Sequence, residues 1–225
     1  MKVAIGIVKY ENKPEFNKYL DYVIKMNPDI DFKVYIKQDI KYGDDFDEIR
    51  ISKLANLRNE LTKEIMKDNE TERFDWIAFV DDDLYINPAV FYELKNLNNN
   101  EVKALGVVSY SLISNQFLIV DINAGTIQKM PNETTGLKYF KLNKDHYPDQ
   151  CWIVKPEILE QIGEPYFEYN KSIAKYETYV FAYKISKITD WYILNIICLC
   201  DESRNEHQMT YEEQLKKSLS YSPFR

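Results

Sequence analysis

Glycine and cysteine are scarce in this sequence, and each shortage excludes a class of site. Only six glycines occur among the 225 residues. They form no glycine-rich loop over residues 5–12, where nucleotidyltransferases and other phosphotransferases usually hold phosphates. The three cysteines, Cys151, Cys198 and Cys200, are odd in number and contain no CxxC pair, which argues against a disulfide framework or a zinc knuckle. We therefore expect reduced thiols and a cytoplasmic location.

Long apolar runs and an excess of basic charge are also missing. The apolar run at residues 3–8 is too short for a signal-peptide core. The longest later run, residues 191–200, is interrupted by Asn195 and falls short of a membrane span. The formal charge of −7 and the pI near 5.1 provide no basic field for a nucleic-acid backbone or an anionic membrane. The composition thus predicts a soluble protein with no transmembrane segment and no nucleic-acid partner.

The first hundred residues alternate between strand and helix patterns. Strands are predicted at residues 3–8, 32–36 and 76–80, and helices at 14–23, 52–65 and 88–97. In the second helix Ser52 is the predicted cap, Leu54, Leu57, Leu61 and Ile65 form the predicted buried stripe, and Arg58 lies beside that stripe. This alternation is typical of a parallel sheet covered by helices.

Beyond residue 100 the pattern changes. Residues 102–110 and 117–122 predict a hairpin, residues 125–147 a long loop of the kind that forms lids, and residues 149–154 and 191–200 buried strands. Helices are predicted at 156–162, closed by Gly163, and from Tyr176 onward. We expect a single domain over 1–209, with halves 1–100 and 101–209, followed by a tail helix over 210–225.

The most informative stretch is WIAFVDDDLYINP at residues 76–88, in which an apolar strand runs into Asp81, Asp82 and Asp83. Three adjacent carboxylates repel one another unless they face water or bind a cation. Carboxylate oxygens suit a hard divalent ion, Mg²⁺ or Mn²⁺. Strand alternation would direct Asp81 and Asp83 to the same side for the metal and nucleotide, and Asp82 elsewhere, toward the ribose or a structural partner.

Other candidates also follow predicted strands, where open α/β sheets bind their ligands. Lys9, Tyr10 and Glu11 follow the first strand, and Asp39 follows the second, although Asp39 is equally well explained as a turn residue. Trp152 is placed either beside a sugar ring or in the core.

Taken in order, these segments resemble the GT-A-fold glycosyltransferases with a DxD motif, and most of all their small inverting family-2-like members. The resemblance extends from Val3 to about His207 and rests on the ordered set more than on any one piece. The matching segments are IGIVKYENKP (5–14), Asp39, ANLRNE (55–60), FVDDD (79–83), DQCWIVKPEILEQIG (149–163), YETYVFAYK (176–184) and His207. It implies a GT-A-like three-layer α/β/α sandwich with a Rossmann-like, mostly parallel central sheet and antiparallel additions.

The resemblance implies a hexosyltransferase-type enzyme with a UDP- or GDP-sugar donor, a divalent metal, and a glycan, lipid or protein acceptor. The residues implied in base and ribose binding are Lys9, Tyr10, Glu11 and Asp39, with Arg58 close to the base or diphosphate. Asp81 and Asp83 would hold the metal and ribose, Asp83 being the stronger ligand, and His207 would complete the metal site. Residues 1–100 would then be the nucleotide-sugar-binding half and residues 101–209 the acceptor and catalytic half.

The catalytic base is the weakest part of the resemblance. Glu177 matches the first residue of the family's Glu-Asp pair, but Thr178 stands where the second acid, often the base, is usual. Glu177 takes that role, or Asp149 does, or no such base is needed. A helix-start carboxylate explains Glu177 as well. Two other functions stay open: a nucleotidyltransferase, and a non-catalytic nucleotide-sugar-binding module.

Overall fold

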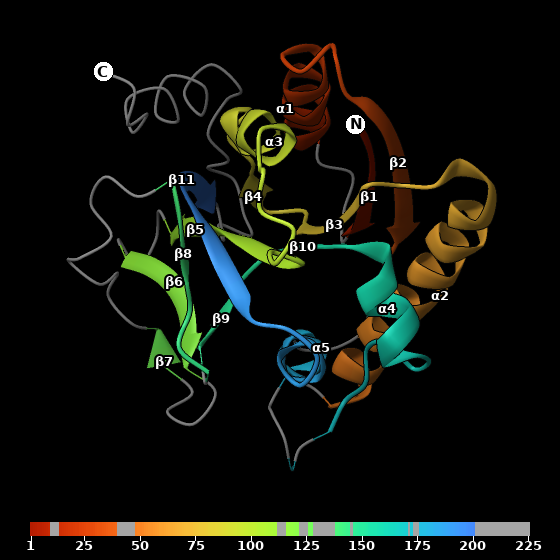
Figure 1. Cartoon of the computed structure of the whole chain (residues 1–225). Coiled ribbons are helices and arrows are strands. Elements are labelled where there is room, and N and C mark those ends of the chain that lie inside the picture. The colour runs from red at the N-terminus through yellow and green to blue at the C-terminus, as the bar shows by residue number, and fades with distance from the viewer. Residues whose placement is uncertain are drawn as a thin grey trace.

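The computed structural model describes residues 1–9, 14–39, 48–111, 116–121, 126–127, 138–144, 146–170, 172 and 176–200. A central sheet runs through both predicted halves, in the strand order β2-β1-β3-β10-β5-β11-β4 (Figure 1). Its strands are β1 (Lys2–Lys9), β2 (Asp31–Gln38), β3 (Trp76–Asp81), β4 (Leu84–Tyr85), β5 (Ala104–Ser111), β10 (Cys151–Val154) and β11 (Trp191–Cys200). β1, β2, β3, β5 and β11 run in one direction, whereas β10 and β4 run in the other.

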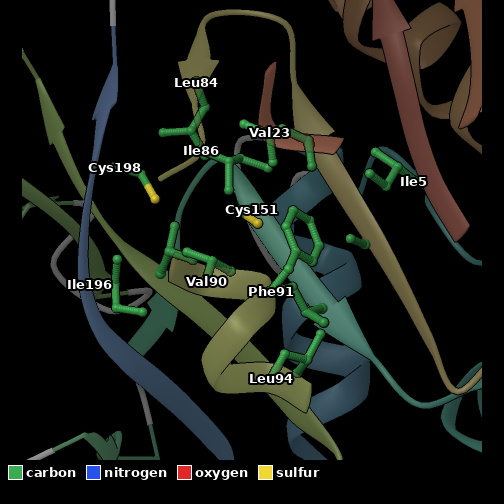
Figure 2. Packing of buried hydrophobic residues seen from close by; sticks show 14 of the residues in the cluster. Ile5, Val23, Leu84, Ile86, Val90, Phe91, Leu94, Cys151, Ile196 and Cys198 are labelled. Atoms are coloured by element: carbon green, nitrogen blue, oxygen red, sulfur yellow. The ribbon is translucent and has the colours of Figure 1, made fainter. Parts of the chain in front are cut away.

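Helices cover both faces of the sheet, because its central strands are apolar on both sides. In β1, Val3, Ile5 and Ile7 belong to one core cluster, while Ala4 and Val8 belong to the other. The first cluster includes α1 (Pro14–Lys25) and α3 (Ala89–Lys95), and the second includes α2 (Glu48–Glu72), α4 (Pro156–Ile162) and α5 (Glu177–Ser186). Figure 2 shows side chains of the first cluster, among them Val90, Phe91 and Leu94 of α3 and Cys151 of β10. The result is a three-layer α/β/α sandwich.

Helix α2 differs from its prediction in both its start and its rotation. It begins at Glu48, so Ser52 is an exposed residue within the helix and not its cap. Leu54 and Leu57, two members of the predicted stripe, are only half-buried. The buried residues are Ile51, Ala55, Arg58, Leu61, Thr62 and Ile65. Arg58 therefore lies on the buried stripe and not beside it, and this rotation places its side chain in the site described below.

The second half confirms the predicted hairpin and the terminal strand. β5 pairs antiparallel with β6 (Gln116–Asp121), and β11 spans the predicted 191–200. Helix α4 ends at Ile162 and is followed by Gly163, whose φ of 66° is a left-handed value that glycine adopts without strain. The predicted tail helix, 210–225, lies outside the described residues.

The predicted loop at 125–147 contains three short strands among its described residues. These are β7 (Thr126–Ile127), β8 (Tyr139–Lys141) and the start of β9 (His146–Pro148). β8 pairs with β11, and β7 and β9 both pair with β6, so this part of the chain adds to the sheets. Among the helices of the described ranges, none has the length and apolarity needed to cross a bilayer.

Candidate functional site

The carboxyl ends of three parallel strands bring together residues that are far apart in the sequence. β1 lies between β2 and β3, with Lys9 opposite Gln38 and Val8 opposite Asp81. The Asp39 N–H donates to the Lys9 carbonyl oxygen at 2.6 Å. Lys9, Asp39 and Asp81 therefore lie along the same edge of the sheet, as the sequence predicts. Tyr10 and Glu11 lie outside the described residues.

Asp39 and Lys9 are buried and interact with the flanking helices. Only 2% of the Asp39 side chain is exposed, and its carboxylate lies 3.1 Å from Lys53 Nζ and 3.8 Å from Arg50 Nη2 of α2. The Lys9 ammonium donates to the side-chain oxygen of Asn17 on α1. Asp39 is thus more than a solvated turn residue, because its charge is balanced by α2.

Only the first of the three consecutive aspartates belongs to the strand. β3 ends at Asp81, and Asp82 and Asp83 form the turn that leads to β4. Strand alternation therefore does not determine their directions, which corrects the reasoning from the sequence. Asp82 is nevertheless set apart from its neighbours, since it is buried whereas Asp81 and Asp83 are partly exposed.

Arg58 is the charged residue that joins this edge to the second half of the chain. Its Nη2 donates to Asp81 Oδ1 at 2.7 Å, and its Nε donates to Glu177 Oε1 at 3.2 Å. The guanidinium carbon lies 5.8 Å from the centre of the Trp152 ring and 5.7 Å from that of the Phe167 ring. Both distances are within the range of cation–π attraction. The guanidinium keeps its charge, because the two carboxylates raise its pKa more than burial lowers it.

Glu177 occupies the first turn of α5, where a carboxylate is favoured by the helix dipole. Its side chain is 4% exposed. Burial raises the pKa of the Glu177 carboxyl above the ordinary 4.5, and the nearby Arg58 charge opposes that rise. Thr178 is buried beside it. Glu177 is therefore first of all the partner of Arg58.

Asp149 precedes a residue, Gln150, that has an unusual backbone conformation. Gln150 has a φ of 61°, which is uncommon for a residue with a side chain. Its N–H donates to Asp149 Oδ1 at 3.1 Å, and its carbonyl accepts the Asp81 N–H at 3.0 Å. The half-buried Asp149 is consequently linked to Asp81 through a single residue.

Tyr179 is a site residue that the sequence did not single out. Its hydroxyl pKa is raised, mainly by burial and further by the negative charge of Asp149, with smaller contributions that include Asp81 and Glu177. It thus lies among the candidate carboxylates. Its position two residues after Glu177 could have indicated a place in the site. The sequence contains 18 tyrosines, however, so a single tyrosine does not stand out.

Trp152 does not occupy a sugar-binding surface. Its side chain is 0% exposed, and its Nε1 donates to the Pro148 carbonyl oxygen at 3.0 Å. β10 is covered on both faces by the core, so a tryptophan on this strand packs inside. The expectation of sugar contact was wrong, and the core alternative holds.

A metal site is only partly visible in the described ranges. Within them no group of three or more His, Cys, Asp and Glu side chains is arranged to bind a metal ion. Asp81 and Asp83 supply carboxylate oxygens, the donor type that Mg²⁺ and Mn²⁺ prefer. The third predicted ligand, His207, lies outside the described residues.

Comparison with solved structures supports the fold predicted from the sequence. No family model matches the chain, and no curated protein matches it. Among solved structures, A197 from STIV has a TM-score of 0.54 at 14% identity, covering 93% of this chain and 100% of that one. The inositol-1-phosphate CTP transferase from T. maritima has a TM-score of 0.50 at 8% identity, covering 96% of each chain. The fold is GT-A-like.

A third solved structure is less similar to this chain. A glycosyltransferase involved in the glycosylation of the major capsid of PBCV-1 covers 98% of this chain and 100% of its own, at 10% identity and a TM-score of 0.39. In the GT-A-like fold of this chain, the mostly parallel sheet and its antiparallel additions are as predicted. Its carboxyl edge combines the buried Arg58 with Asp81 at the end of β3, Asp149 before β10 and Glu177 at the start of α5. The carboxylate oxygens of this set can accept hydrogen bonds from hydroxyl groups.

Proposed function

We propose that this protein is a metal-dependent glycosyltransferase that moves a sugar from a UDP- or GDP-sugar to an acceptor hydroxyl with inversion. The observation that carries the proposal is the position of Asp81 at the end of β3 and of Asp83 in the turn that follows, at the carboxyl edge of a GT-A-like sheet. Lys9 and Asp39 at the ends of the two neighbouring strands provide polar groups for the nucleoside. The acceptor is a glycan, lipid or protein hydroxyl.

Asp81, Asp83 and His207 would bind the divalent ion, Mg²⁺ or Mn²⁺. Oδ1 of Asp81 bonds to Arg58, so a cation would use Oδ2 of that carboxylate. When bound, the ion neutralises the charge that develops on the departing diphosphate. We assign Asp82, which is buried, to holding the turn that carries Asp81 and Asp83.

We assign the base to Asp149 in preference to Glu177. The Glu177 carboxylate is 4% exposed and bonded to Arg58, so it is poorly placed to take a proton from an acceptor. Asp149 is half-buried and linked to Asp81 through Gln150. In this role it accepts the proton of the acceptor hydroxyl as that oxygen attacks the anomeric carbon. A comparison of Asp149→Asn with Glu177→Gln tests the choice, since only the first is expected to abolish turnover.

A nucleotidyltransferase is the second candidate, and the likeness to the inositol-1-phosphate CTP transferase favours it. The scarcity of glycine near residues 5–12 argues against it, because such enzymes cradle phosphates with a glycine-rich loop. A binding module without catalysis is the third candidate, suggested by Thr178 in place of the usual acid.

One assay separates the three candidates. The purified protein is incubated with a panel of nucleotide sugars, acceptors and Mn²⁺ or Mg²⁺, and the released products are measured for wild type and Asp83→Ala. Asp29→Ala is the matched control, because it removes an exposed aspartate that pairs with Lys95. Release of nucleoside diphosphate that is lost in Asp83→Ala but kept in Asp29→Ala supports the glycosyltransferase.

The other outcomes are equally informative. Pyrophosphate release from a nucleoside triphosphate and a sugar phosphate would establish the second candidate. Nucleotide binding without turnover of any donor would favour the module. Calorimetry that detects no nucleotide binding, with or without metal, would refute the glycosyltransferase.

A further inference from the structure

Arg58 contacts side chains from several separate parts of the fold. Asp81 comes from the end of β3, Glu177 from the start of α5, Trp152 from β10, and Phe167 from the segment after α4. The hydrogen-bonded partners are 23 and 119 residues away in the sequence. One side chain on α2 thus connects the strand that carries the aspartates to the helix on the opposite half of the chain.

We propose that Arg58 is a positioning residue: it holds the Asp81 carboxylate in place and ties it to α5 through Glu177, instead of contacting the nucleotide. Its significance for catalysis rests on the function proposed above, in which Asp81 binds metal and donor. This differs from the role implied by the family resemblance, which places Arg58 next to the base or diphosphate.

The burial of the guanidinium supports this assignment. Only 8% of the Arg58 side chain is exposed, and both Nη2 and Nε donate to carboxylates. Glu177 accepts the Nε–H and Asp81 accepts one Nη2–H, so a diphosphate that bound at these two positions would displace a carboxylate from its cation. Asp81 is more accessible, with 26% of its side chain exposed, so the substrate side of the pair is the aspartate.

The shape of the side chain explains why arginine is required. Nε and Nη2 are fixed in one plane, so they present hydrogen bonds in set directions to two different carboxylates. A lysine ammonium is a single point at the end of a flexible stem, and it cannot reproduce this pair of fixed directions. The rings of Trp152 and Phe167 also favour a flat, weakly hydrated cation.

The first experiment needs no turnover. Crystal structures of wild type, Arg58→Met and Lys63→Met are compared for the position of the Asp81 carboxylate. Lys63 is the matched control, because it lies on the same helix and pairs with Glu164, but is 52% exposed. We expect the Asp81 carboxylate to leave its position in Arg58→Met and to keep it in Lys63→Met. An Asp81 carboxylate that keeps its wild-type position in Arg58→Met would overturn the proposal.

The second experiment separates positioning from direct contact. We expect Arg58→Met to lower kcat about 100-fold, the scale of a misplaced catalytic group, with a KM for the donor within about threefold of wild type. Arg58→Lys is expected not to restore kcat. A raised KM with unchanged kcat would show that Arg58 touches the nucleotide, and would overturn the proposal.

A double variant separates positioning from mere stability. Arg58→Met leaves the Glu177 carboxylate buried without its cation. The double variant Arg58→Met/Glu177→Gln removes that charge as well. If Arg58→Met does not fold, the double variant is used in its place. We expect the double variant to regain the wild-type melting temperature but not kcat. Recovery of both would mean that Arg58 serves only stability. If wild type turns over no nucleotide sugar, the proposed function fails, while the position of the Asp81 carboxylate in the Arg58→Met structure still decides whether Arg58 positions that carboxylate.

Discussion

Replacement of Asn59 by alanine should destabilise the protein far more than its half-buried position suggests. The Asn59 amide makes a reciprocal pair with the backbone of Phe167: Nδ2 donates to the carbonyl oxygen at 2.6 Å, and Oδ1 accepts the N–H at 2.9 Å. Phe167 is 0% exposed, so both of its backbone groups would lose their partner in a buried segment. Each stranded group costs roughly 1–3 kcal/mol, and with water reaching part of the gap we expect a total of about 2–4 kcal/mol.

The assay is urea and thermal unfolding of Asn59→Ala beside Asn56→Ala. Asn56 is an exposed asparagine on the same helix, and its replacement should change the free energy of unfolding by less than about 0.5 kcal/mol. For a chain of this size the Asn59 loss corresponds to a fall in Tm of roughly 4–16 °C. Equal unfolding midpoints for the two variants would show that the Phe167 segment is held by packing alone. That packing includes the stacked rings of Phe167 and Phe181, whose centroids lie 4.1 Å apart.

Three further outcomes are expected. Gly106→Ala should lower the yield of folded protein, measured by circular dichroism, because the added Cβ would lie 2.0 Å from Pro148 Cβ; a wild-type melting temperature would contradict this. Trp152→Phe should lower the free energy of unfolding in urea by about 1–3 kcal/mol, because it leaves the buried Pro148 carbonyl oxygen without its donor, while the donor KM stays at its wild-type value because the ring is buried. For Glu177 the folded pKa is raised above 4.5, so its favourable contribution to stability is complete below pH 4.5 and is lost as pH rises through the folded value. The free energy of unfolding of wild type should therefore fall relative to that of Glu177→Gln as pH rises from 4.5. A difference in free energy of unfolding that stays constant with pH would refute the burial argument.

Much of the fold could be predicted because its signals are local. The apolar run before Asp81 gave β3, the run from Trp191 to Cys200 gave β11, and Pro156 with Gly163 bounded α4. The short strands β7, β8 and β9 escaped prediction, because two or three residues carry no period and their pairing depends on distant partners.

The rotation of α2 could not be predicted for a related reason. A charged residue is normally assigned to the solvent side of a helix, and this rule placed Arg58 beside the stripe. Its burial becomes favourable only when Asp81 and Glu177 supply carboxylates and two rings cover the guanidinium. Those partners are fixed by tertiary structure, so the sequence of α2 alone contains no signal for them.

The same arrangement offers a reason for threonine at position 178. Thr178 is buried next to Glu177, at the start of the helix that meets Arg58. Arg58 already bonds two carboxylates through Nε and Nη2. A third acid at this buried position would need either another cation or a proton to remain inside, because an isolated buried charge is costly. Thr178 avoids that cost, and in the proposed reaction the proton acceptor would be Asp149, which is linked to Asp81 through Gln150.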